Sequence, residues 1–291
     1  MSEPTGSGRT GLQPYWDEVS GRYATADPLA AVCYPGAPPW FNRFIGLFQA
    51  RAVARALVGV PVRGTRALDV GCGMGRWTRW LSAQGAEVTG IDPTEEMIEA
   101  ARRLSSDLDY RRMSATVIGF PDASFDLVIA VTVIQHLRPE EQRAAMGEIA
   151  RILRPGGHAL LLDLIDRGDR GPVVFPRAPE DWIALARELG LDLVAWRGQE
   201  FIPLIRTGWR IANAFGKRPA GEGAAAPVPG ENRNESWFDR MQKRSGLRIL
   251  LLPLRLMVWA SYLIEWLCER LAPARLARHG CFLVRRRATA P

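Results

Sequence analysis

Between residues 66 and 200, short apolar runs alternate with longer amphipathic stretches. Strands that alternate with helices in this way predict parallel βαβ units. The run over 125–131 is apolar almost throughout, as expected of a strand buried on both faces. Pro155, Gly156 and Gly157 are expected to end the helix before the fifth strand. The expected strands are 67–70, 87–91, 109–113, 125–131, 158–165 and 191–196, and the expected helices are 76–84, 95–104, 140–153 and 180–189.

The chain before this region predicts a separate helical part. Residues 1–13 are expected to be a disordered leader, and 15–23 a short helix. A turn-rich break over 34–39 precedes a stretch over 40–58 whose apolar residues recur close to the helical period. We therefore treat 14–60 as an N-terminal helical segment.

Residues 247–271 form a strongly apolar stretch near the other end of the chain. It is long enough to suggest a membrane span, but it contains Pro253 and several charged residues. Arg248, Arg255, Tyr262 and Glu269 lie seven residues apart, so on a helix they form one narrow polar stripe. Such a helix packs as a cap, forms a dimer interface or lies in a membrane interface, and the pattern leaves all three open.

Composition locates the charge. The formal net charge is +7, yet residues 236–291 hold 11 basic and 3 acidic side chains, a net of +8, so the remaining 235 residues sum to −1. A basic tail could face an anionic substrate, a membrane surface, a partner's acidic face or only solvent. The region of alternating strands and helices carries no readable basic groove, so we expect no nucleic-acid partner.

The cysteines and the N-terminus bear on the compartment. Cys33, Cys72, Cys268 and Cys281 are scattered, which argues against a disulfide framework or a zinc site and for a reducing compartment. The first residues have no apolar core and do not look like a signal peptide. We therefore expect a cytoplasmic protein with no bound metal.

The first strand leads into a glycine loop with the spacing G-x-G-x-G, formed by Gly71, Gly73 and Gly75. The dinucleotide fingerprint G-x-G-x-x-G would need glycine where Arg76 stands, and Asp92 ends the next apolar run. The stretches 68–75, 88–92, 125–129 and 153–157 resemble, in order and spacing, four successive motifs of class I S-adenosylmethionine-dependent methyltransferases. The resemblance covers about residues 60–200.

The resemblance implies a fold and a division of the chain. The fold is α/β: a Rossmann-like, seven-stranded mixed sheet with helices on both faces, whose last strand is antiparallel, with 281–286 as the candidate. By resemblance, 14–60 is an N-terminal helical lid, and 61–200 with 280–287 is the S-adenosylmethionine-binding core. Residues 201–279 are then a helical cap inserted before the last strand, with a flexible loop over 216–235 that is rich in Gly, Ala and Pro.

The resemblance also implies cofactor contacts. Asp69 braces the glycine loop and contacts the amino group of the cofactor, and the glycines let the backbone approach it. Asp92 accepts from the ribose hydroxyls, although it could instead cap the next helix. Ser114 stands where many relatives have an acid that binds the adenine amino group, which weakens that recognition. The implied cofactor set is Asp69, Gly71, Cys72, Gly73, Gly75, Asp92, Pro93, Met97, Ser114, Ala115 and Val131.

Residues for the acceptor are less defined. His136, after the fourth strand, could act as a general base or only make a structural hydrogen bond. His279 could face the site from the cap. Aromatic residues suggest an apolar or aromatic acceptor, or stacking on a sugar face, with ordinary packing as the alternative. The candidate pocket residues are Tyr15, Trp16, Tyr23, Trp40, Phe41, Trp209, Trp237 and His279.

We therefore expect methyl transfer from S-adenosyl-L-methionine to an oxygen of a small metabolite, with S-adenosyl-L-homocysteine as product. One alternative is methylation of a glycan or lipid-linked acceptor at a membrane face, because residues 247–287 are apolar and basic. Another is a non-catalytic protein that binds S-adenosylmethionine, for which Ser114 is the only support. A homodimer is a further alternative for the assembly.

Overall fold

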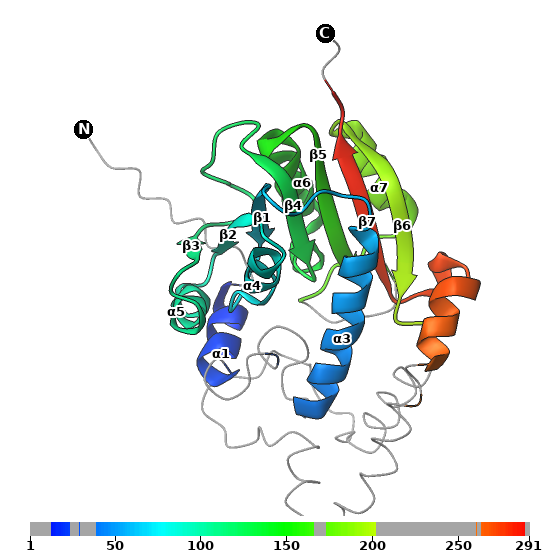
Figure 1. Ribbon diagram of the computed structural model, residues 1–291, viewed down its shortest axis with the longest axis horizontal. Coiled ribbons are helices and arrows are strands. Elements are labelled where there is room, and N and C mark those ends of the chain that lie inside the picture. The colour runs from blue at the N-terminus through cyan, green and yellow to red at the C-terminus, as the bar shows by residue number, and fades with distance from the viewer. Residues whose placement is uncertain are drawn as a thin grey trace, which may run out of the picture.

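The computed structural model describes residues 13–23, 29, 39–165, 173–201, 260 and 263–288. Its centre is a seven-stranded sheet with the strand order β3-β2-β1-β4-β5-β7-β6. Neighbours among β1 to β5 run parallel, whereas β7 runs antiparallel to both β5 and β6 (Figure 1). The expected mixed α/β sheet with an antiparallel last strand is confirmed. The strands are β1 (Arg66–Val70), β2 (Glu87–Asp92), β3 (Asp109–Arg112), β4 (Phe125–Val131), β5 (Leu153–Leu164), β6 (Leu191–Gln199) and β7 (His279–Arg286).

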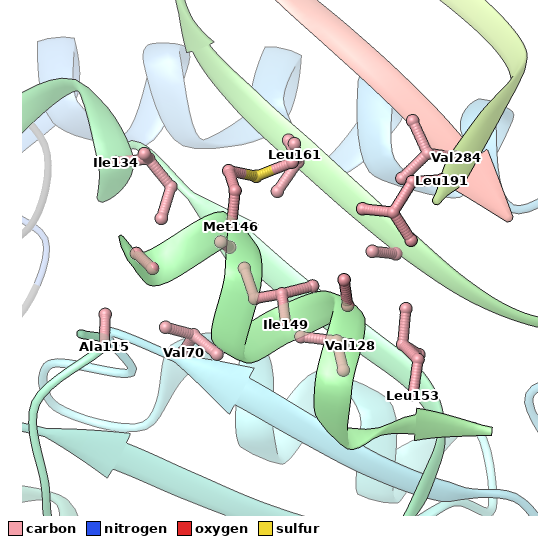
Figure 2. Close-up of a cluster of buried hydrophobic side chains, with 14 of the residues drawn as sticks. Val70, Ala115, Val128, Ile134, Met146, Ile149, Leu153, Leu161, Leu191 and Val284 are labelled. Atoms are coloured by element: carbon pink, nitrogen blue, oxygen red, sulfur yellow. The ribbon is translucent and has the colours of Figure 1, made fainter. Parts of the chain in front are cut away.

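Helices cover both faces of the sheet because the central strands are apolar on both sides. In β4, Val128 and Ala130 pack into one buried cluster with α6 and α7, shown in part in Figure 2. Leu127 and Ile129 point to the other face, where the buried cluster includes α3 and α4. The helices are α1 (Gln13–Tyr23), α3 (Pro39–Ala56), α4 (Arg76–Ala83), α5 (Glu95–Leu104), α6 (Pro139–Ile152) and α7 (Pro179–Glu188), with short 3-10 turns η1 (Ile134–His136) and η2 (Ala274–Leu276).

The strand order places a crevice at the carboxyl ends of β1 and β4. The chain adds β2 and β3 on one side of β1, then returns to place β4 and β5 on the other side. In open α/β sheets, ligands bind outside the strand ends where the order reverses in this way. The loops that follow β1, β2 and β4 therefore meet at one edge.

One boundary differs from the sequence prediction. Pro155, Gly156 and Gly157 do not lie in a loop after α6 but inside β5, which already begins at Leu153. The register between β4 and β5 is irregular here, and Gly156 has φ +81. A Cβ at Gly157 would lie 2.9 Å from the carbonyl oxygen of Arg154. The Pro-Gly-Gly run therefore shapes an irregular strand start.

The two N-terminal helices take different places. α1 contacts α5 and lies near the carboxyl ends of the strands, whereas α3 packs on a face of the sheet through residues such as Val53 (Figure 1). The expected flexible loop 216–235 lies outside the described residues, as does most of the expected cap. The described part of that segment includes a helix over 263–271, coloured orange in Figure 1. Among the described residues, no helix is long and apolar enough to cross a membrane.

Candidate functional site

The loop between β1 and α4 is the backbone of the site. Gly71, Gly73 and Gly75 have φ of 66, 51 and 76, the left-handed region that glycine adopts without strain. A Cβ at Gly71 would overlap the side chain of Val133, and one at Gly75 would overlap the ring of Tyr110. The loop therefore requires glycine for its dihedral angles and for the close approach of its neighbours.

Asp92, the last residue of β2, ties this loop to the next one. Its carboxylate accepts the backbone N–H of Gly73 at 3.0 Å and that of Thr94 at 2.9 Å. Burial raises the pKa of Asp92 to about 6, although both backbone bonds lower it. The Thr94 side chain donates to Asp92 as well, and because a carboxylate has about four lone-pair positions, Asp92 keeps acceptor capacity beyond these three bonds.

Asp69 lies behind the loop. Its carboxylate accepts the hydroxyl hydrogen of Thr78 in α4 at 2.7 Å, and burial raises its pKa to about 7. It does not line the cavity described next. Asp69 therefore supports the glycine loop from below by fixing the first turns of α4.

The loops that follow β1, β2, β3 and β4 enclose a cavity at the strand ends. Most of the residues that the sequence suggested for a cofactor meet there, with Trp16 of α1 closing one side. Among its lining residues, Asp92 and His136 are the titratable ones. The lining consists of Trp16, Gly71, Gly73, Asp92, Pro93, Thr94, Met97, Ser114, Ala115, Val131, Thr132, Val133, His136 and Leu137.

Not every candidate reaches this cavity. Asp69, Cys72 and Gly75 belong to the loop and its support but do not line it. Tyr15 packs edge-on against Trp16, with ring centroids 5.1 Å apart, and so supports a lining residue. The remaining aromatic candidates are not described: the side chains of Tyr23, Trp40 and Phe41, and the whole of Trp209 and Trp237.

The expectation that His279 faces the site from the cap is wrong, since His279 is the first residue of β7. It is buried, and its Nδ1 lies 2.8 Å from the carboxylate of Glu200. It pairs across the sheet with Leu164 and Gln199 and does not line the cavity. The sequence does not indicate whether a histidine next to the last strand belongs to that strand or to the segment before it.

The hydrogen bonds of His136 distinguish a general base from a structural residue. Its Nδ1 lies 2.9 Å from the carbonyl oxygen of Val173, and because a carbonyl only accepts, Nδ1 carries the proton. Nε2 then accepts from the side-chain amide of Gln135 at 3.2 Å. Burial lowers the pKa of His136 to about 4. Both ring nitrogens are thus engaged within the protein, and the ring is neutral near pH 7.

The turn that carries His136 is clamped to the end of β5. Asp163 accepts the backbone N–H of Gln135 at 3.1 Å, and the Gln135 side-chain oxygen accepts the N–H of Leu164 at 2.8 Å. Burial raises the pKa of Asp163 to about 7. On its other side, the His136 ring packs edge-on against Trp16, with centroids 4.9 Å apart.

Sequence reasoning missed Thr94, Thr132, Val133 and Leu137 as lining residues. Thr132 has φ 57, which is rare for a β-branched residue, and its N–H donates to the carbonyl of Leu162 at 2.6 Å. Strained backbone of this kind gathers at functional sites. No local sequence signal marks it, since the neighbouring strand end imposes the conformation.

The described part of the chain shows the state of three cysteines and bears on metal binding. Cys72, Cys268 and Cys281 are free there. Within the same residues, no group of three or more His, Cys, Asp or Glu side chains could hold a metal ion.

Comparison with known proteins gives matches to one kind of domain. Residues 68–161 match the family model described as "Methyltransferase domain". The O-methyltransferase rstn1 of Aspergillus nomiae is 35% identical over 142 residues, which are 46% of this chain and 62% of that relative, less than two thirds of its length. A ubiquinone biosynthesis O-methyltransferase of Methylocella silvestris is 32% identical over 176 residues, 53% of this chain and 68% of the relative.

Among solved structures, the magnesium protoporphyrin IX methyltransferase of Synechocystis PCC 6803, crystallised with bound S-adenosylmethionine, has a TM-score of 0.51 to this chain. It is 18% identical, and the match covers 67% of this chain and 91% of that one. At this identity the likeness supports the fold alone.

Proposed function

Because this chain belongs to the class I S-adenosylmethionine-dependent methyltransferases, we propose that it transfers a methyl group to an oxygen of a small, apolar or aromatic metabolite. S-adenosylmethionine is the cofactor and S-adenosylhomocysteine the product. The observation that carries the proposal is the cavity in which the glycine loop, Asp92 and the end of β4 meet.

The residues present fit this cofactor. Gly71 and Gly73 offer a backbone without side chains along one wall, and Asp92 has free acceptor capacity for ribose hydroxyls. Pro93, Met97 and Ala115 give an apolar wall for the adenine ring.

Ser114 stands at the adenine edge, where its hydroxyl lies 2.9 Å from that of Thr116 and accepts the Thr116 N–H at 3.2 Å. A hydroxyl held in this way can accept a hydrogen bond from the adenine amino group, more weakly than a carboxylate would. Ser114 therefore fits a cofactor-binding protein as well as an active enzyme.

The chain's residues contribute to the reaction mainly by holding and shielding the reactants. When bound, S-adenosylmethionine supplies a methyl group already activated by its sulfonium. The cavity walls then need to align the acceptor and exclude water, which is where most of the rate advantage of such a transfer lies. Trp16 and His136, packed edge to face, form part of the cavity wall.

We assign His136 a structural role in this reaction. A general base near pH 7 needs a free lone pair and a pKa near 7. His136 has its Nε2 lone pair engaged by Gln135, and burial lowers its pKa to about 4. The ring therefore shapes the cavity wall rather than accepting a proton from the acceptor.

An uncharged acceptor suits the lining. Trp16, Val131, Val133 and Leu137 are apolar, and no Lys or Arg is among the lining residues that the structure describes. The two relatives reported above are named O-methyltransferases, which favours oxygen as the methylated atom. Transfer to a glycan or lipid-linked acceptor and a non-catalytic role are not favoured over this reaction. The cytoplasmic location and the homodimer remain predictions.

Calorimetric titration of the purified chain with S-adenosylhomocysteine tests the cofactor. Turnover on a panel of small phenols, carboxylic acids and amines, followed by mass spectrometry of the products, then tests the acceptor class. We expect product binding and a mass gain of one methyl group on an oxygen. Absence of binding would refute the proposal, and methylation of amines alone would refute its choice of atom.

A further inference from the structure

The helix over 263–271 turns its acidic side chains toward the protein and its apolar ones outward. Its two acidic residues face inward. Glu265 is fully buried, and both its carboxylate oxygens accept the backbone N–H of Phe201 at 3.0 Å. Glu269 lies 2.8 Å from Arg51 of α3 and also pairs with Arg55. These contacts fix which side of the helix faces the rest of the protein.

The opposite side is apolar and exposed. Leu263, Ile264, Leu267 and Leu271 are 62%, 50%, 42% and 80% exposed. Leu263 and Ile264 are adjacent, and Leu267 and Leu271 follow them by three, four, seven or eight residues, so the four lie on one side of the helix. Leu276, in the turn that follows, is 62% exposed. The helix could not turn these apolar side chains inward without turning Glu265 and Glu269 away from their partners. We call these five residues the leucine face.

Basic side chains accompany the leucine face. Arg270 is exposed and stacks over the ring of Trp266, with the guanidinium carbon 3.7 Å from the ring centroid, and Arg275 is also exposed. Glu265 and Glu269 are the only acidic residues between 263 and 276, and both point inward. The outward side of this segment therefore combines apolar and positive groups.

Anionic lipid matches this combination. Contiguous exposed apolar surface on a folded protein marks an interaction site. A helix with Leu on one side and Arg beside it lies in the bilayer interface, with the apolar side chains at the acyl boundary and the guanidinium groups among the headgroups. In sequence, the apolar stretch begins well before this helix, and residues 236–291 carry a net of +8 (11 basic minus 3 acidic).

We propose that the leucine face, with Arg270 and Arg275, is a docking surface for the anionic face of a lipid bilayer. The surface lies beside the end of β6, because Glu265 binds the residue two positions after that strand. Binding there is peripheral and reversible. It adds a location to the proposed reaction and does not depend on which acceptor is methylated.

Co-sedimentation of the full chain with vesicles tests the proposal. One set is phosphatidylcholine alone, and the other contains about one third phosphatidylglycerol, which gives a negative surface. We expect the chain to sediment with the anionic vesicles at low salt, to bind the neutral ones weakly, and to be released as salt screens the arginines.

A matched pair of variants locates the surface. Leu267→Gln and Leu104→Gln replace helical leucines of similar exposure, 42% and 48%, but Leu104 ends α5 beside β3, at the opposite edge of the sheet. Gln is a good helix former and changes no charge. The pair Leu263→Gln with Leu271→Gln should weaken vesicle binding by about tenfold or more, and Leu267→Gln by several-fold, because each removes apolar area from the lipid contact. Leu104→Gln should not change it.

Charge and assembly are tested separately. Arg270→Ala with Arg275→Ala should remove the preference for anionic over neutral vesicles. Thermal unfolding and S-adenosylhomocysteine binding, measured on every variant, show whether folding and the cofactor site are unchanged. A chain that binds vesicles but no S-adenosylhomocysteine refutes the proposed function and leaves the docking surface standing.

Three results would overturn the docking proposal. The first is that the unmodified chain does not bind anionic vesicles at low salt, and the second is that Leu104→Gln and Leu267→Gln weaken binding equally. The third is that light scattering shows a dimer, which the leucine variants dissociate, while the chain binds no vesicles. The last result would assign the leucine face to a second copy of the chain.

Discussion

Replacing Asp92 by Asn should separate cofactor binding from folding. In the folded chain, one carboxylate oxygen accepts the N–H of Gly73 and the other accepts that of Thr94. The Thr94 side chain also donates to this carboxylate, and we propose that the remaining acceptor capacity binds the ribose hydroxyls. Asn has one oxygen and an NH2 group, so it loses the charge and one of the two acceptor sites.

The substitution should change cofactor affinity much more than it changes stability. A hydrogen bond to a charged group contributes about 1.5–3 kcal/mol, so the affinity for S-adenosylhomocysteine should fall by roughly 10- to 150-fold. Stability should change little. The variant leaves one buried N–H without its acceptor, at a cost of about 1–3 kcal/mol. It also removes the cost of keeping Asp92 ionised, about 3 kcal/mol given its pKa of about 6.

Isothermal titration calorimetry at about pH 7.5, where Asp92 is ionised, measures the affinity. Asp122→Asn is the control, since Asp122 is an exposed acid paired with Arg151 away from the cavity. The affinity of the unmodified chain should also fall as pH drops below about 6, because Asp92 then takes up a proton. An Asp92→Asn variant that binds within threefold of the unmodified chain, or that retains this pH dependence, would refute the role of Asp92.

Three further predictions follow from the same region. Gly71→Ala should lower the free energy of unfolding by more than about 1 kcal/mol, because φ is +66 and no Cβ fits there; chemical denaturation with unchanged stability would count against this. His136→Asn keeps a donor for the Val173 carbonyl, so kcat should fall less than about tenfold; a 100-fold loss that also removes a limb of the pH–rate profile would instead indicate a general base. Lowering pH from about 8 to about 6 should raise the free energy of unfolding by about 4 kcal/mol, because Asp69, Asp163 and Glu265 take up protons only in the folded chain. The lowered pKa of His136 offsets a small part of this gain, and urea unfolding at several pH values that shows stability falling toward pH 6 would contradict it.

The order of elements could be predicted from the sequence because its signals are local. Hydrophobic periodicity and turn residues placed α5 at 95–104 and β4 at 125–131, the bounds that the structure has. The same local signals misplaced the Pro155-Gly156-Gly157 run. Proline and glycine usually end elements, but here β4 beside them pairs with Leu153 and extends β5 back through the run.

The cofactor wall was also predictable, since it follows a spaced motif. Gly71, Gly73 and Asp92 line the cavity because the G-x-G loop and the end of the second strand meet wherever this strand order forms. The partners of His136 were not predictable. Val173 lies 37 residues away in sequence, and no local pattern marks its carbonyl as a hydrogen-bond acceptor.

The sequence by itself therefore determined the α/β alternation, the glycine loop and the acid at the end of the second strand, because backbone preference and spacing act over a few residues. Only the tertiary structure decided the state of His136, the strain at Thr132 and the outward turn of the leucine face. Those depend on which distant groups are brought within hydrogen-bond distance, as when Arg51 and Phe201 hold Glu269 and Glu265 inward. Burial of the titratable groups then shifts their pKa values, which happens only once the chain is folded.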